Sequence, residues 1–291
     1  MGAMTAPSKP PAIVLPPRLG GVTTFRQVAR QCLDHADANE PFLDVNGDHE
    51  GLHQFRVGYR RLRSLFSLAR PVSRIDPEAD RLRGRLRDLT VTLGPARDLD
   101  VFREAHPTLI ERDARHLEAA RVTAYGQMHT FLTSDEWLQS RADLERWLAR
   151  GEYAGVFGTR AWSGRGWTAQ ALERRRNRIA KMGRALADLS DADRHKVRIE
   201  AKKVRYGCQF FGSLWPAQRE DAQRLEKLLG NLQDRLGHLN DSVTWAGIVE
   251  LAGLTDAEPP HVDVDAEIAA AQLIVDELVT VPAFWQRTLR R

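Results

Sequence analysis

The 291-residue sequence contains only two cysteines, Cys32 and Cys208, which lie far apart and outside any CxxC spacing. This scarcity excludes a disulfide framework and argues against a thiolate zinc site. The sequence also lacks an apolar run long enough to span a bilayer, and its N-terminus lacks the layout of a signal peptide. We therefore expect a cytoplasmic protein in which each cysteine is a small apolar residue of a helix.

An excess of one charge sign is also lacking. Lysine and arginine total 43 and aspartate and glutamate total 39, so the formal net charge is only +4. Whole-chain charge therefore does not indicate a polyanionic partner, and only a local concentration of basic residues could do so. Hydrophobic residues make up 42% of the chain, enough to bury a substantial core.

Sequence motifs for common catalytic sites are missing too. There is no GxxxxGK[ST], GxSxG or HExxH motif, and no GxGxxG in a strand context. Nucleotide binding and nucleophilic catalysis therefore lack support, and we expect no cofactor.

What the sequence does have is helical periodicity. Leucines recur three or four residues apart along most of the chain, which predicts an all-α fold. We expect residues 1–17 to be a disordered tail and residues 18–291 to be one domain. Within it, the Gly-rich segment 151–166 is expected to link a first helical bundle (18–150) to a second (167–291), with about four helices each. Asp76 is expected to cap a helix that begins at Pro77.

The two halves repeat one motif at identical spacing. The first copy is His53-x-x-Arg56-Val57-x-x-Arg60-Arg61-Leu62-Arg63, and the second copy is His195-x-x-Arg198-Ile199-x-x-Lys202-Lys203-Val204-Arg205. Further along, Leu93-Gly94-Pro95-Ala96-Arg97-Asp98 corresponds to Leu236-Gly237-His238-Leu239-Asn240-Asp241. Because both segments recur at nearly the same offset, a whole helix-loop-helix unit is duplicated.

Each copy of the motif predicts a basic helix face. At about 100° per residue, His53, Arg56, Arg60 and Arg63 fall within roughly a quarter of the helix circumference. No acid occurs between His53 and Arg70, although like charges one turn apart repel. An uncompensated stripe of this kind favours an anionic ligand. Inorganic polyphosphate repeats its charges at a spacing comparable to the helical turn, and arginine and lysine both bind phosphate.

The alternative is that acids from neighbouring helices neutralise these charges. Asp98, Asp100 and Asp241 are candidates for this role. Further basic residues that could enlarge the ligand surface are second-tier candidates, and they are Arg81, Arg85, Arg175, Arg178 and Arg224.

These motifs resemble the CHAD family, the conserved histidine α-helical domain, from about Leu19 to the C-terminus. The resemblance implies two pseudo-symmetric four-helix bundles with a basic pore or groove. It also implies non-catalytic binding of inorganic polyphosphate and localisation to polyphosphate granules. The implied ligands are His53, Arg56, Arg60, Arg61, Arg63, His195, Arg198, Lys202, Lys203 and Arg205. Tyr206, which ends the second motif, is expected to pack or orient rather than bind.

The resemblance is to a stand-alone CHAD domain. Many family members carry a CYTH triphosphatase domain, whose Glu-x-Glu-x-Lys strand is not found here. A nucleic-acid-binding protein using the same basic surface is the alternative, although no base-reading or aromatic pattern accompanies the stripes. A phosphate-transforming enzyme would need Asp98, Asp100 or Asp241 as metal ligands. No metal is expected at the histidines, because the arginines around them disfavour a divalent cation.

Overall fold

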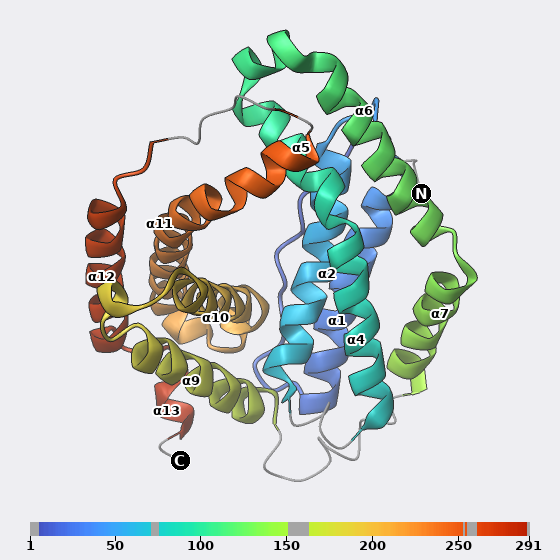
Figure 1. Cartoon of the computed structure of the whole chain (residues 1–291). Coiled ribbons are helices and arrows are strands. Elements are labelled where there is room, and N and C mark those ends of the chain that lie inside the picture. Colours follow the sequence, from blue (N-terminus) through green and yellow to red (C-terminus); the bar gives the residue numbers. More distant parts are fainter. Residues whose placement is uncertain (1–5, 71–75, 151–162, 253, 255–260, 290–291) are drawn as a thin grey trace.

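The computed structural model describes residues 6–70, 76–150, 163–252, 254 and 261–289, except for the side chains of 107–113 and 242–243. Regular secondary structure in this part of the chain is helical (Figure 1), and an isolated bridge pairs Gly20 with Ser163. The predicted all-α class is therefore confirmed.

The first half of the chain runs through six described helices. They are α1 (Gly21–Asn39), α2 (Glu50–Leu68), α4 (Pro77–Thr92), α5 (Gly94–Ala105), α6 (Pro107–Leu132) and α7 (Asp135–Arg150). The predicted start of α4 is confirmed. The Asp76 carboxylate accepts hydrogen bonds from the backbone N–H groups of Glu78 (2.9 Å) and Ala79 (3.3 Å), and Pro77 is the first helical residue.

The described second half contains fewer α-helices, and one of them, α11, is the longest of the described helices. They are α9 (Gly164–Met182), α10 (Asp191–Phe211), α11 (Arg219–Leu251), α12 (Val264–Thr280) and the short α13 (Gln286–Leu289). Short 3-10 turns, η3 (Gly212–Leu214) and η4 (Pro216–Gln218), join α10 to α11.

The number of helices in the first half differs from the expected four, partly because of one proline. α2 and α10 carry the two copies of the basic motif, and α11 follows as a single helix. The corresponding segment of the first half is divided into α4 and α5, with Pro95 where α11 has His238. Proline lacks the N–H that would continue the helix and crowds the preceding turn, so the first half breaks where the second continues.

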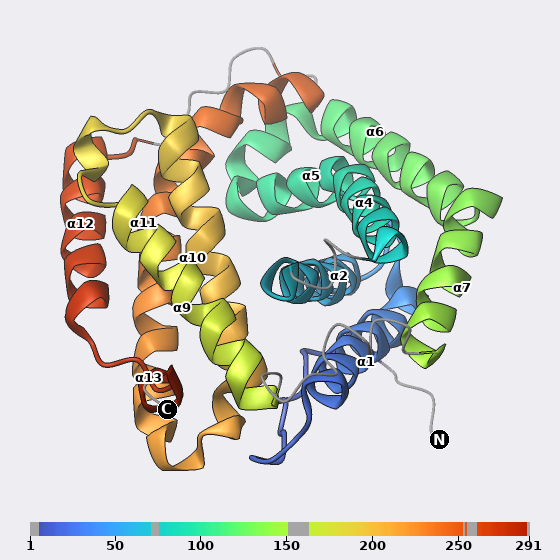
Figure 2. The ribbon, with the colours of Figure 1, turned by 90° about the horizontal axis from the view of Figure 1, so that it is seen from below.

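The two halves lie side by side, and α2 packs against α10 where they meet (Figures 1 and 2). α1 also contacts α9, and α5 contacts α11. Phe55 and Leu62 of α2 and Val197 and Val204 of α10 are 0% exposed, as their place opposite the basic stripes predicts. The apolar stripes thus fix the rotation of both helices, and with it the direction of their basic faces.

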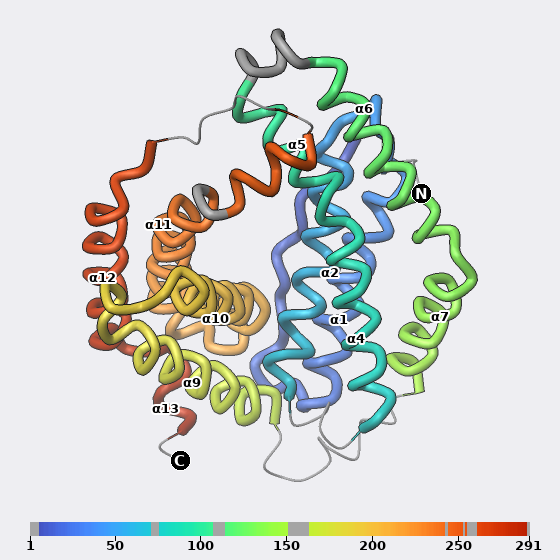
Figure 3. Tube along the Cα trace, in the orientation of Figure 1, coloured from blue at the N-terminus to red at the C-terminus, as the bar shows by residue number. Residues whose placement is uncertain are grey.

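The N-terminal segment, residues 6–17, differs from the expected disordered tail. It runs between the two halves, as the dark blue trace in Figure 3 shows, with Ile13 and Leu15 only 6% and 1% exposed. Leu15 N–H donates to Ser213 Oγ (2.8 Å), and Ser8 N–H donates to the side chain of Asn39 (2.9 Å). The Ala- and Pro-rich composition obscured two apolar residues, Ile13 and Leu15, that pack in the core on either side of the exposed Val14. Residues 1–5 lie outside the described residues.

The predicted linker, 151–166, extends beyond the start of α9 at Gly164. Ser163 caps α9, since its Oγ accepts a hydrogen bond from Gly166 N–H (3.0 Å), so Gly164 and Gly166 belong to the helix. The remaining linker residues, 151–162, lie outside the described residues.

Candidate basic ligand site

The basic stripes of α2 and α10 meet across the junction of the two halves. Arg60 of α2 donates a hydrogen bond from Nε to the Tyr206 hydroxyl of α10 (2.9 Å). Tyr206 is 3% exposed, and its ring stacks on Phe210 with centroids 6.0 Å apart. The expectation that Tyr206 orients rather than binds agrees with this geometry, because its hydroxyl holds the guanidinium of a stripe residue.

The surroundings of Lys202, on α10, show that the two stripes converge. Its pKa is lowered to about 7, first by burial and then by the charges of Arg60, Arg198, Arg205 and Arg56. Two of these arginines come from α2 and two from α10. The ammonium group therefore lies in a field of positive charge built by both halves of the repeat.

His53 and Arg56 lie in the same field. Burial and the neighbouring Arg97 lower the pKa of His53 to about 4, with smaller contributions from Arg60 and Arg56. Burial also lowers the pKa of Arg56 to about 10, while Asp98 opposes this effect. These groups form what we call the central basic cluster, which comprises His53, Arg56, Arg60, Arg63, Arg97, Arg198, Lys202 and Arg205.

The charges of Asp98, Glu50 and Asp88 act on Arg56, His53 and Arg63, but they do so without direct ion pairs. Among the described residues, none of its side chains forms an ion pair with a carboxylate. Arg56 Nη1, Arg97 Nη1 and Arg205 Nε are buried and find no hydrogen-bond partner among the described residues. Asp98 is the acid whose charge acts on Arg56, yet burial raises the pKa of Asp98 itself. Buried nitrogens without acceptors are costly, so this cluster is suited to receive acceptor atoms from a ligand.

The repeated Leu-Gly positions lie close to the arginines of the stripes. A Cβ on Gly237 would lie 3.4 Å from Arg198 Nη2, and a Cβ on Gly94 would lie 3.9 Å from Arg56 Nη1. These are ordinary contact distances, so each guanidinium packs against the glycine of its own repeat. Arg198 is further held by a hydrogen bond from Nε to the Gln233 carbonyl (3.3 Å).

Two predicted ligands, Arg61 and Lys203, are not brought into the cluster. Arg61 is 6% exposed, and its guanidinium lies over the Phe210 ring, 5.2 Å from the centroid. Lys203 pairs with Glu200 at 2.8 Å. Each residue directly follows a stripe position along its helix, so it projects about 100° away from the stripe.

His195 and Arg63 are stripe residues that interact with neighbouring helices. His195 Nδ1 contacts the side-chain oxygen of Asn240 at 2.5 Å, and Asn240 corresponds in the repeat to Arg97. The pKa of Arg63 is lowered by burial and then by Arg87 and Arg83 of α4. These interactions place His195 beside α11 and Arg63 beside α4.

The second-tier candidates are paired with acids away from the cluster. Arg81 bonds Glu78 and Asp143 (both 2.6 Å), Arg85 bonds Glu136, and Arg224 bonds Glu277 (2.9 Å). Arg175 and Arg178 share Glu200, at 2.8 and 3.9 Å. The structure thus gives these arginines the acidic partners that the cluster lacks.

Arg97 is a cluster member that the sequence reasoning missed as a ligand. It lies at the start of α5 within the repeated Leu-Gly segment, and its counterpart is the uncharged Asn240. Its charge acts on His53 and Arg56 because the start of α5 lies close to the basic face of α2. The repeat itself could have indicated this, since the segment accompanies the motif in both halves.

Asp100, a further acid near the first motif, has structural partners. The buried Asp100 accepts hydrogen bonds from Arg121 Nη2 (2.9 Å) and from the Tyr125 hydroxyl (2.8 Å). Cys32 and Cys208 are free and buried. Among the described residues, no group of three histidine, cysteine or acidic side chains is placed to hold a metal ion. None of the described helices has both the length and the apolarity of a bilayer crossing.

Comparison with known proteins gives a family match and a structural match. Residues 27–250 match the CHAD domain family. The crystal structure of the CHAD domain from the plant Ricinus communis superposes with a TM-score of 0.67 at 24% sequence identity. The match covers 98% of this chain and 95% of that chain, and at this identity it shows the fold. A search of curated proteins finds no match.

Proposed function

The chain belongs to the CHAD domain family, and on that premise we propose that it binds inorganic polyphosphate at the central basic cluster without catalysing a reaction. The observation that carries the proposal is the position of Lys202. Its ammonium group lies among arginines of both α2 and α10, and none of these cations pairs with a described carboxylate.

The free protein bears an electrostatic cost at this cluster. Burial together with mutual repulsion lowers the pKa values of Lys202 and His53 below their ordinary values of 10.5 and 6.5. A bound anion would relieve that repulsion and would supply acceptors to the unpartnered nitrogens of Arg56 and Arg205. Binding energy is therefore available to a ligand of high negative charge.

A linear polyanion suits this arrangement better than a single phosphate. Arg56, Arg60 and Arg63 follow one another at about one helical turn, roughly 5 Å, along α2. Arg198, Lys202 and Arg205 repeat the pattern on α10. Successive phosphates of one chain could pair with successive side chains, whereas a lone phosphate would engage only part of the cluster. Arginine offers a planar fork and lysine a compact charge to such a ligand.

We propose binding alone because the nearby carboxylates already interact with arginine or tyrosine side chains. Phosphoryl transfer requires groups that position the nucleophile or a metal beside the phosphate. Asp100 is committed to Arg121 and Tyr125, and Asp98 lies beside Arg56 and Arg97. In the cell, we propose that polyphosphate binding brings the protein to polyphosphate granules, which a fluorescent fusion would test.

The proposal is tested with two paired variants. Arg56→Ala with Arg60→Ala, and Arg198→Ala with Lys202→Ala, should each weaken binding of long-chain polyphosphate by about a hundredfold or more, since two charge-assisted contacts are lost. Isothermal titration at fixed salt measures this loss. The logarithm of the wild-type association constant should also fall steeply with the logarithm of salt concentration.

The matched control is Arg81→Ala with Arg85→Ala, which removes the same charge from α4 where both arginines already have acidic partners. Its affinity should stay within about threefold of wild type. Unfolding of both cluster variants would make the stripes structural. A preference for duplex DNA over polyphosphate at physiological salt would contradict the proposed ligand.

A further inference from the structure

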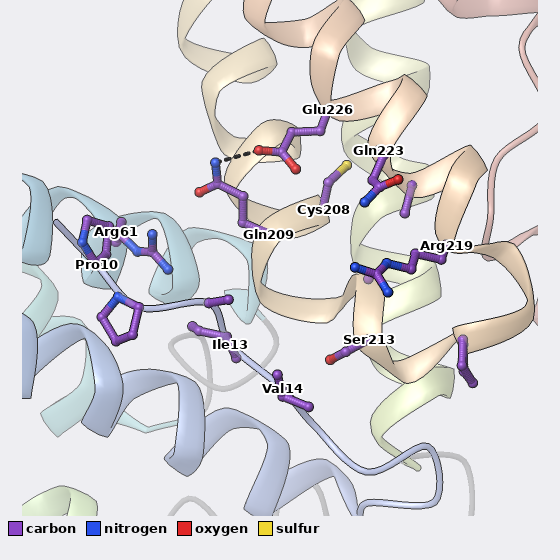
Figure 4. A pocket seen from close by; sticks show the side chains of 15 residues that line it. Pro10, Ile13, Val14, Arg61, Cys208, Gln209, Ser213, Arg219, Gln223 and Glu226 are labelled. Carbon is purple, nitrogen blue, oxygen red and sulfur yellow. Dashed lines mark hydrogen bonds between the residues drawn. The ribbon is translucent and has the colours of Figure 1, made fainter.

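A cavity of about 710 Å³ lies apart from the central basic cluster, between the N-terminal segment and the α10–α11 corner (Figure 4). Residues 10–14 line one side, and Gln209, Arg219 and Glu226 line the other. Arg61 reaches the cavity from α2. A volume of this size falls within the range of roughly 300–1,000 Å³ that is typical of small-molecule sites.

Arg61 is a buried cation without an acidic partner. It is 6% exposed, and among the described residues no carboxylate forms an ion pair with it. Its contacts are the face of Phe210 and the Cys32 thiol. Burial raises the pKa of Cys32 to about 11, so this thiol is neutral near pH 7 and cannot balance the charge. A buried unpaired guanidinium is costly unless something else supplies negative charge.

A second cavity, related to the first by the internal repeat, shows which charge the first cavity lacks. Lys203 corresponds to Arg61 and lines a smaller cavity of about 320 Å³ together with Ser67, Asp80 and Arg83. These last three residues correspond in the repeat to Gln209, Gln223 and Glu226, which line the larger cavity. The two cavities are therefore related by the internal repeat, and residues of both halves line each of them.

The smaller cavity contains its own counter-charge. Glu200, one turn before Lys203, pairs with it at 2.8 Å. The position corresponding to Glu200 on α2 is Gly58, where a Cβ would lie 2.7 Å from Ala36 Cβ and 2.9 Å from the Cys32 carbonyl. The close approach of α1 therefore leaves no room for an acid beside Arg61.

We propose that the larger cavity binds a small organic anion, with its carboxylate or phosphate group on Arg61 and its apolar body against the N-terminal segment. The exposed Arg219 would attract the anion at the cavity, and no carboxylate among the described residues pairs with Arg219. Glu226 is a negatively charged residue of the cavity lining and would repel an anion. Its carboxylate accepts a hydrogen bond from Gln209 Nε2 (2.7 Å). The anionic group is therefore directed to the Arg61 end, away from Glu226.

The apolar part of the lining distinguishes this ligand from inorganic polyphosphate. Pro10, Ile13, Val14 and Ala222 offer surface to a hydrocarbon body and no donors from their side chains to a phosphate chain. The inference thus stands on the cavity itself and holds whether or not the central basic cluster binds polyphosphate.

The probe for this site is 1-anilinonaphthalene-8-sulfonate, an aromatic anion whose fluorescence rises in an apolar pocket. Arg61→Met should weaken its binding by about tenfold or more through loss of a buried charge-assisted contact. Lys203→Met, the corresponding change in the other half, should leave its affinity unchanged. Equal probe affinity of these two variants would overturn the proposal.

A second pair of variants tests the site even if Arg61→Met does not fold. Arg219→Gln changes an exposed cavity residue and should weaken probe binding about threefold. Arg224→Gln changes another exposed arginine of α11, which pairs with Glu277 outside the cavity, and should have no effect. Equal affinities of these two variants would also count against the site.

Competition identifies the ligand chemistry. Octanoate or octyl phosphate should displace the probe, and whichever does so at lower concentration identifies the preferred anionic group, whereas octylammonium should not displace it. Displacement by octylammonium as readily as by octanoate would overturn the assignment to an anion. Displacement of the probe by long-chain polyphosphate would show that this cavity is part of the proposed polyphosphate site and not a separate site. If polyphosphate does not bind the protein at all, the proposed function fails and the result for the cavity still stands.

Discussion

The most informative single residue in the structure is Lys202. Its ordinary pKa of 10.5 falls to about 7 in the folded protein because burial and four surrounding arginines disfavour its charged form. The unfolded chain therefore binds more protons than the native protein between pH 7 and 10.5, so this residue makes stability rise with pH across that window. Below pH 7 both states are protonated, and the full cost of the buried charge is present.

Lys202 gives the proposed polyphosphate site a pH dependence of known sign. A bound polyphosphate chain would raise the pKa of Lys202, so binding would take up as much as one proton near pH 8. Between pH 7 and 9 the association constant should fall as pH rises, by at most about tenfold per pH unit. Titration calorimetry in two buffers of different ionisation enthalpy measures both the affinity and the proton uptake.

Lys202→Met is the control for this dependence. It should bind more weakly at pH 7, with an affinity nearly constant between pH 7 and 9, because Arg56 does not titrate until about pH 10. A wild-type affinity that is flat from pH 7 to 9 would show that Lys202 does not touch the ligand.

At the scale of helices, the sequence predicted which faces are basic and which are buried. The spacing of Phe55 and Leu62 relative to His53 and Arg60 was sufficient to assign the buried and the basic face of α2, because helix geometry alone relates these positions. The cap at Asp76 was predictable for the same reason, since a cap is a local interaction.

What the sequence could not predict depends on packing between helices. Arg81 and Arg85 resemble ligand candidates by sequence, yet Asp143 and Glu136 of α7 neutralise them from more than fifty residues away. Arg97 joins the cluster for a related reason, because only the fold shows that α5 lies beside α2. Charge pairing across elements is set by tertiary structure, so composition and periodicity do not reveal it.

The contact between α2 and α10 depends on Tyr206, which provides a test at the same scale. Tyr206→Phe removes the hydrogen bond that orients Arg60 but keeps the ring that stacks on Phe210. Affinity for long-chain polyphosphate should fall about three- to tenfold, while the melting temperature should change little. A structural role alone would give the opposite pattern, with a lower melting temperature and an unchanged affinity.

For the whole molecule, the duplication matters because each half supplies only part of the proposed polyphosphate site. Arg56 and Arg60 come from the first half, and Arg198 and Arg205 come from the second, yet all four act on one ammonium group. Such convergence argues for one shared polyphosphate site rather than one site per half. A ligand bound there would stabilise both halves together.

Stoichiometry separates one shared polyphosphate site from two. With the shortest polyphosphate chains that still bind at full affinity, the wild-type protein should bind one chain per molecule. The paired variants in α2 and α10 should each lower the affinity for that one chain. If the halves bound independently, each paired variant would instead retain one site of wild-type affinity, and the number of chains bound would drop by half. Titration of protein at concentrations well above Kd resolves these two cases, because the equivalence point then reports the number of sites directly. We expect the equivalence point to stay unchanged in both variants, since the cations they remove surround the same Lys202 or include it.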